Sequence, residues 1–128
     1  MDRLDLDERE VARALSVGRA GIGALCCLFP KKATRYWTGE ETDSPTLTMA
    51  IRGMGARDLA IGMATLNALE NGGPVDDWLR AGAIADASDA WGILTSYGRL
   101  PKLRRMLLLA SAGGAVWLGL RAAADFSD

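Results

Sequence analysis

The chain alternates between long apolar stretches and short polar ones rich in proline, glycine and charge. Within each long stretch the apolar residues recur every three to four positions, as on one face of a helix. This pattern predicts four helices, at about residues 7–29, 46–69, 76–97 and 102–124. No stretch alternates apolar and polar residues over a useful length, so the predicted fold class is all-α.

The segments between the predicted helices contain the proline, glycine and polar residues that are typical of turns and helix ends. Pro30 is expected to end the first helix, and the polar residues that follow read as a connector. Asp43 or Ser44 is expected to cap the second helix, with Pro45 at its first position. Connections of this length favour antiparallel neighbours, which predicts an up-down-up-down four-helix bundle.

A chain of 128 residues is expected to form one domain, residues 1–128, with residues 1–13 as a polar N-terminal extension. That extension is acidic and mixed in charge, without the basic start and apolar centre of a secretory signal. We therefore expect a protein that is not secreted.

Several features favour a membrane over water. Residues 106–120 carry no charge, and the stems of Arg105 and Arg121 extend this apolar length close to a full span. Many of the 15 glycines fall inside predicted helices, where each costs about 1 kcal/mol in water but permits close helix contact in a bilayer. Aromatic residues gather near the predicted helix ends: Phe29, Tyr36, Trp37, Trp78 and Tyr97.

These features predict a multi-pass protein of the cell membrane, with the lipid bilayer as its partner. Basic residues concentrate in loops 30–45 and 98–104, so the positive-inside rule predicts that both loops are cytoplasmic. The basic residues of the N-terminal segment oppose this orientation. A soluble bundle, favoured by a mean hydropathy of only +0.07, is the alternative.

Counting inward from the predicted helix ends places five charges near the bilayer centre: Arg19, Arg57, Asp58, Asp86 and Asp89. A charge that faces lipid there costs about 3 kcal/mol or more, so these side chains are expected to meet one another. Arg52 is expected to supply the positive charge that two arginines lack against three aspartates. The predicted buried cluster therefore contains six residues.

Two interpretations of this cluster are open. It can be an ionic lock that specifies which helices meet and in which register. Alternatively, its excess carboxylate can carry a proton, with Asp86, Asp89 and Asp58 as the candidate catalytic residues. Asp86 and Asp89 share a helix face with Gly82, which lets a neighbouring helix approach both carboxylates.

Composition excludes much other chemistry. The absence of histidine removes the commonest general base and metal ligand. Cys26 and Cys27 are adjacent on a helix and are interpreted as small buried residues rather than a disulfide, a reactive pair or a lipidation site. No cofactor or metal site is predicted, and 15 basic against 16 acidic residues indicate no nucleic-acid partner. Trp91 and Trp117 are interpreted as packing residues.

The runs "GMGARDLAIGMATL" and "LRAGAIADASDAWGIL" carry the motifs GARDLAxG and DAxDA. Over most of the chain after residue 14, the sequence resembles a family of small four-helix membrane proteins of actinobacteria, a domain of unknown function. The resemblance implies a membrane protein in which Arg57, Asp58, Asp86 and Asp89 matter, but it brings no reaction with it.

The first hypothesis is a small integral membrane protein of non-enzymatic or accessory role, with the charge cluster joining its helices. A homo-oligomer or a larger membrane complex is compatible with that role. The alternatives are a membrane acid–base isomerase or cyclase that acts on a lipophilic substrate through Asp86 and Asp89, and a proton-linked carrier subunit.

Overall fold

A computed structural model of the chain describes residues 3–39, 43–95 and 101–127. These residues form helices and no strand, which confirms the all-α class. The helices number five within the described ranges: α1 (Arg3–Leu28), α2 (Pro30–Thr38), α3 (Pro45–Asn71), α4 (Val75–Thr95) and α5 (Lys102–Asp125).

The prediction of a polar connector after the first helix is wrong, because α2 occupies most of it. Pro30 follows the end of α1 but also opens α2, since its fixed φ and missing N–H suit the first turn of a helix. The new helix buries Pro30 and Thr34, one turn apart, and leaves its lysines exposed. Gly39, with a φ of 89°, closes α2 in the left-handed conformation.

The remaining helix ends follow the capping chemistry of the sequence. Ser44, rather than Asp43, caps α3, and its hydroxyl accepts a hydrogen bond from the Leu47 N–H at 3.3 Å. Gly72, with a φ of 72°, ends α3. Helix α1 begins at Arg3, so it includes most of the predicted N-terminal extension. The predicted end of the third helix near Tyr97 lies outside the described residues.

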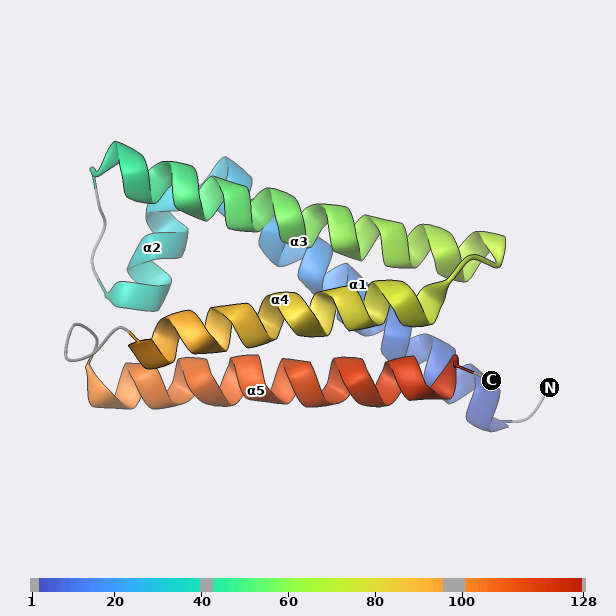
Figure 1. The fold of residues 1–128 in the computed structure, drawn as a ribbon. Helices are drawn as coiled ribbons and strands as arrows, with labels where there is room; N and C mark the ends of the chain where they lie inside the picture. The colour runs from blue at the N-terminus through green and yellow to red at the C-terminus, as the bar shows by residue number, and fades with distance from the viewer. Residues whose placement is uncertain (1–2, 40–42, 96–100, 128) are drawn as a thin grey trace.

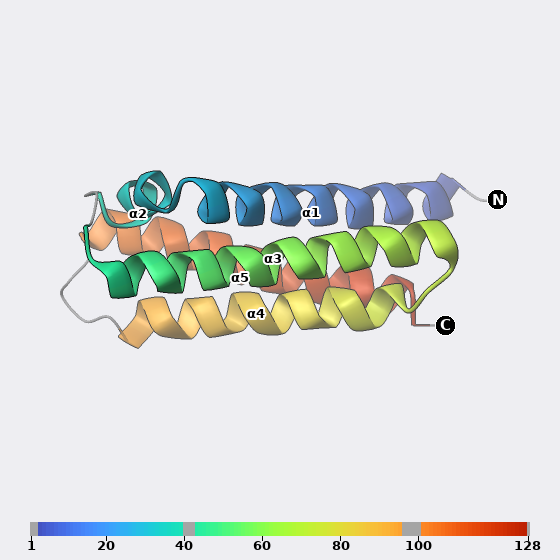
Figure 2. The same cartoon turned by 90° about the horizontal axis from the view of Figure 1, so that it is seen from above.

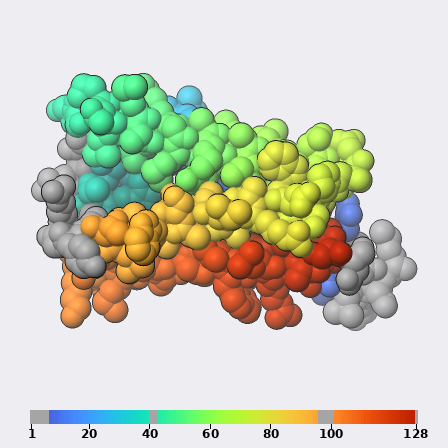
Figure 3. All heavy atoms as spheres, in the orientation of Figure 1, coloured from blue at the N-terminus to red at the C-terminus, as the bar shows by residue number. Residues whose placement is uncertain are grey.

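The four long helices lie side by side, and both termini are at the same end of the molecule (Figures 1 and 2). Helix α1 packs closely on α3, and α4 packs closely on α5, with α3 beside α4. The space-filling view shows α4 lying against both α3 and α5 (Figure 3). Helix α1 crosses obliquely behind this layer and makes only a narrow contact with α5 (Figure 1).

Glycines bring the backbones of α1 and α3 together. A Cβ atom on Gly23 would lie 2.5 Å from the carbonyl oxygen of Gly55. A Cβ atom on Gly62 would lie 2.7 Å from the carbonyl oxygen of Ser16. Because no side chain fits at these positions, the two helices approach as closely as small-residue interfaces allow.

The interior is built mostly from small residues. The main buried cluster lies toward the end that carries the two termini and comprises Ala12, Ala68, Leu69, Val75, Leu79, Ala122 and Ala123. Large apolar side chains mostly face outward instead. Trp91 is 69% exposed and Trp117 is 61% exposed, so the interpretation of these two tryptophans as packing residues is wrong.

Two helical segments are long and apolar enough to cross a membrane by length and composition. They are Asp7–Leu28 of α1 and the whole of α5. Only 28% of the most apolar stretch of the first segment and 17% of that of the second are buried within the protein, so both helices present most of their apolar surface outward.

Candidate functional site

Five charged side chains from three helices form one continuous network in the middle of the molecule. Helix α1 contributes Arg19, α3 contributes the adjacent Arg57 and Asp58, and α4 contributes Asp86 and Asp89. In order of contact the network runs Asp86, Arg19, Asp58, Arg57, Asp89. The structure thus brings together five of the six residues of the predicted cluster.

Arg19 joins three helices through one guanidinium group. Its Nη1 donates to Asp58 Oδ1 at 3.3 Å and to Asp86 Oδ1 at 3.2 Å, and its Nη2 donates to Asp86 Oδ2. The contact with Asp86 is therefore bidentate, the strongest geometry for an arginine and a carboxylate. The three side chains are only 13–17% exposed.

Arg57 forms the second half of the network. Its Nη1 and Nη2 donate to the two carboxylate oxygens of Asp89 at 3.1 Å and 2.8 Å, a second bidentate pair. Its Nε donates to Asp58 Oδ1 at 3.1 Å. Asp58 is thus shared between both arginines, which explains why an arginine and an aspartate stand side by side in an apolar helix.

Glycine creates the space for this network. A Cβ atom on Gly82 would lie 3.1 Å from Nε, Cζ and Nη2 of Arg19, so the missing side chain leaves room for the guanidinium. The sequence predicted that this glycine lets a helix approach; its closest neighbour is instead the planar end of a side chain. Helix α5 contributes no charge to the network and contacts α4 through Gly119, near Ala83.

The prediction that Arg52 belongs to the cluster is wrong. Arg52 is exposed, and its Nε donates to the carbonyl oxygen of Cys27 at 3.3 Å. The Cys27 thiol in turn donates to the carbonyl oxygen of Arg52 at 3.5 Å. Five positions of helix separate Arg52 from Arg57, a rotation of about 140° that turns it toward another side. The network therefore holds two guanidinium groups and three carboxylates.

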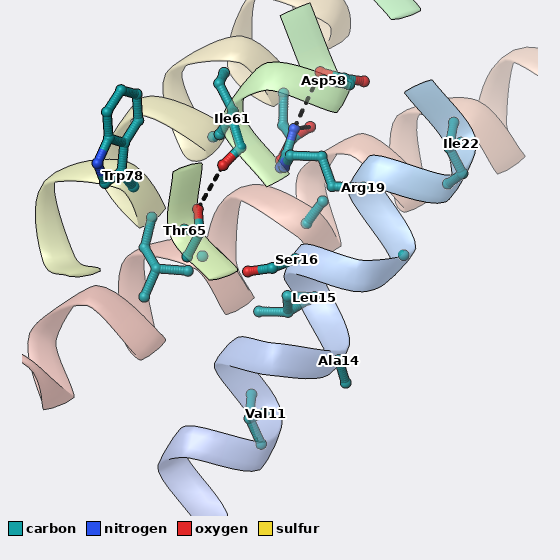
Figure 4. A pocket seen from close by; sticks show the side chains of 16 residues that line it. Val11, Ala14, Leu15, Ser16, Arg19, Ile22, Asp58, Ile61, Thr65 and Trp78 are labelled. Atoms are coloured by element: carbon teal, nitrogen blue, oxygen red, sulfur yellow. Dashed lines mark hydrogen bonds and ion pairs between the residues drawn. The ribbon is translucent and has the colours of Figure 1, made fainter. Parts of the chain in front are cut away.

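A cavity of about 470 Å³ lies against the network, between α1, α3, α4 and α5. Arg19, Asp58 and Asp86 form its charged wall, and Figure 4 shows Arg19 reaching across it toward Asp58. The hydroxyls of Ser16 and Thr65 face the cavity but donate to carbonyl oxygens of their own helices. The apolar wall includes Val11, Leu15, Ile22, Ile61, Trp78 and Leu79.

The other candidate chemistry stays apart from this site. Cys26 is buried, Cys27 is half-buried, and both are free. Within the described part of the chain, no three histidine, cysteine or acidic residues gather closely enough to hold a metal ion.

Comparison with protein-family models, with curated proteins and with solved structures finds no match to this chain. The resemblance to the actinobacterial membrane family therefore stays a prediction that rests on the two motifs.

Proposed function

We propose that the chain is a small integral membrane protein of non-enzymatic, accessory role, in which the Arg/Asp network joins three membrane-spanning helices. The observation that carries this proposal is the pairing of the network. Each of the carboxylates of Asp58, Asp86 and Asp89 accepts hydrogen bonds from a guanidinium group. All lie near the middle of their helices, the most expensive depth for an unpaired charge.

Helix length supports the membrane placement. Helices α1, α3, α4 and α5 have 26, 27, 21 and 24 residues, and each has the length of a span, while α1 and α5 also have the apolar composition of one. The outward apolar surface of α1 and α5 needs a covering, which a bilayer supplies along the whole length of both helices.

The pairing supports a lock over proton chemistry. Two bidentate contacts fix the positions of Asp86 and Asp89 relative to α1 and α3. Carboxylates held in this way keep the neighbouring helices in register. The network thereby specifies how the α4–α5 pair docks on the α1–α3 pair.

Orientation and assembly follow from the same placement. We infer that segments 30–45 and 98–104 face the cytoplasm, because basic residues concentrate in both. The accessory role needs a protein partner or a second copy of the chain. Gly113 and Gly114 of α5 support such a contact, because a Cβ atom on either would meet open space and small residues let another helix approach closely.

The cavity favours a second candidate function. Its volume of about 470 Å³ and its mixed wall fit a small lipophilic molecule with one polar group beside Arg19, Asp58 and Asp86. In this reading the protein is an acid–base isomerase or cyclase, or a subunit of a proton-linked carrier, and Asp86 moves the proton.

Two experiments test these proposals. Membranes that contain the expressed protein are washed with carbonate and then extracted with detergent; retention through the wash supports the spanning placement, and release refutes it. The lock is tested by reversing one pair. Arg57→Asp and Asp89→Arg should each lower the folded yield, whereas the double variant should recover much of it because opposite charges meet again. Failure of the double variant to recover would refute the lock.

A further inference from the structure

A second and larger cavity, of about 900 Å³, opens where α1 diverges from α5. Helix α2 lies at this end of the molecule, with α3 above it and α5 below it in Figure 1. Apolar side chains from α1 and α5 line the cavity, among them Ile22, Leu25, Leu103, Leu107 and Leu108. The volume lies within the range of about 300–1,000 Å³ that is usual for ligand pockets.

Two cations lie in the wall of this cavity, at its α2 end. Lys32 Nζ lies 5.4 Å from the centroid of the Phe29 ring. The Nη1 of Arg104 donates to the carbonyl oxygens of Arg35 and Tyr36 at the end of α2. Among the described residues these bonds use only Nη1, which leaves Nε and Nη2 of Arg104 to meet a ligand.

The surroundings are complementary to an anion with an apolar tail. No acidic residue is among the residues that line the cavity within the described part of the chain. Asp43 is nearby in sequence but is paired with Lys31 at 2.6 Å, and neither lines the cavity. Tyr36 and Trp37 do line it, and such aromatic side chains favour the boundary between headgroups and acyl chains.

We propose that this cavity binds one anionic phospholipid, with an acyl chain between α1 and α5 and the phosphate held by Lys32 and Arg104. The inference rests on the membrane placement proposed above. Basic pockets between spanning helices on the cytoplasmic side are suited to anionic headgroups. Ile22 lines both cavities, so the end of the acyl chain points toward the Arg19 network.

Selectivity for the headgroup is tested with the full chain purified in detergent. The protein is incubated with equal amounts of phosphatidylglycerol and phosphatidylcholine, and the retained lipid is counted by native mass spectrometry. We expect one phosphatidylglycerol per chain. Lys32→Gln should weaken its retention about fivefold, the effect of about 1 kcal/mol for one cation near the headgroup. Lys31→Gln is the matched control and should retain the lipid nearly as well.

Occupation of the cavity by the acyl chain is tested on α5. Ser111 lines the cavity, whereas the adjacent Ala110 does not. Ser111→Phe should reduce lipid retention, and Ala110→Phe, which adds the same ring to a neighbouring exposed position, should not. Equal loss in both variants would overturn the site.

The remaining outcomes separate this inference from the proposed function. Retention of both lipids equally, or of none, in a protein that resists carbonate would overturn the lipid site and leave the membrane placement standing. A dimer without lipid would assign the cavity to a second copy. Release of the protein by carbonate would overturn the placement and the site together.

Discussion

Replacing Arg19 with alanine is the most direct test of the charge network. Arg19 contacts Asp58 and Asp86 on two other helices, and all three side chains are mostly buried. Its removal affects the two carboxylates unequally. Asp58 keeps its contact with Arg57, but Asp86 loses both of its hydrogen bonds to Arg19. One buried carboxylate is therefore stranded.

Stranding one buried charge costs about 3–5 kcal/mol. We expect Arg19→Ala to lower the free energy of unfolding by that amount. The double variant Arg19→Ala/Asp86→Ala should be more stable than Arg19→Ala alone, because it removes the stranded carboxylate as well. Arg80 pairs with Asp76 and Asp77 on its own helix, donates to the hydroxyl of Ser127 and is half exposed, so Arg80→Ala should cost about 1 kcal/mol or less.

Unfolding is measured by titrating the detergent-solubilised protein with sodium dodecyl sulfate and following the helical circular dichroism signal. The single variants, the double variant and the Arg80 control are compared under one set of conditions. Equal stability of Arg19→Ala and the Arg80 control would show that Arg19 does not hold a buried carboxylate. A further loss of stability on removing Asp86 as well would show that Asp86 is not stranded in Arg19→Ala.

Gly23→Ala should destabilise the protein by about 1–3 kcal/mol, because its methyl group meets the backbone of α3, whereas Gly18→Ala, which faces open space, should be neutral or stabilising; both are measured in the same titration. Asp89→Asn keeps one acceptor for its arginine and should retain the fold by circular dichroism; an unfolded variant would contradict this. The hydrogen bond from Lys31 lowers the pKa of Asp43. The pair should therefore stabilise the folded state at pH values above the ordinary pKa of aspartate, and this stabilisation should be lost as the pH falls through the lowered pKa. An Asp43 carboxyl pKa unchanged in Lys31→Gln, measured by NMR, would contradict that assignment.

The sequence predicted the long helices and five members of the charge network because both depend on local information. Helical spacing and capping residues such as Ser44 mark the ends of elements. The sequence could place four of these residues together because each lies near the middle of its own helix, and the middles of antiparallel helices lie at the same level: Arg57, Asp58, Asp86 and Asp89. Arg52 was misplaced because the position of a residue along its helix does not give the direction in which its side chain points around the helix axis.

The rest of the site depends on how the helices pack, which no local pattern specifies. Helix α2 was missed because its lysines suggested a connector, although Pro30 and Thr34 have the spacing of one buried helical face. Both cavities lie beside α1, which crosses obliquely and meets α3 through glycines that are distant from it in the chain. The exposed tryptophans were misjudged because a helix period does not tell an interior from an outward apolar face.

The division of charge among the helices has a consequence for biosynthesis. On the proposed placement, α1 enters the bilayer first with Arg19 unpartnered, and α3 follows with Arg57 and Asp58 already in contact. Helix α4 comes later with Asp86 and Asp89 near its middle, and its own Arg80 pairs with Asp76 and Asp77, so its insertion without Arg19 and Arg57 is unfavourable. Its entry has to wait for the two arginines made earlier. The order of synthesis therefore supplies each arginine before the aspartate that pairs with it on α4. A chain with α4 placed first would have to insert Asp86 and Asp89 into the membrane before either had a partner.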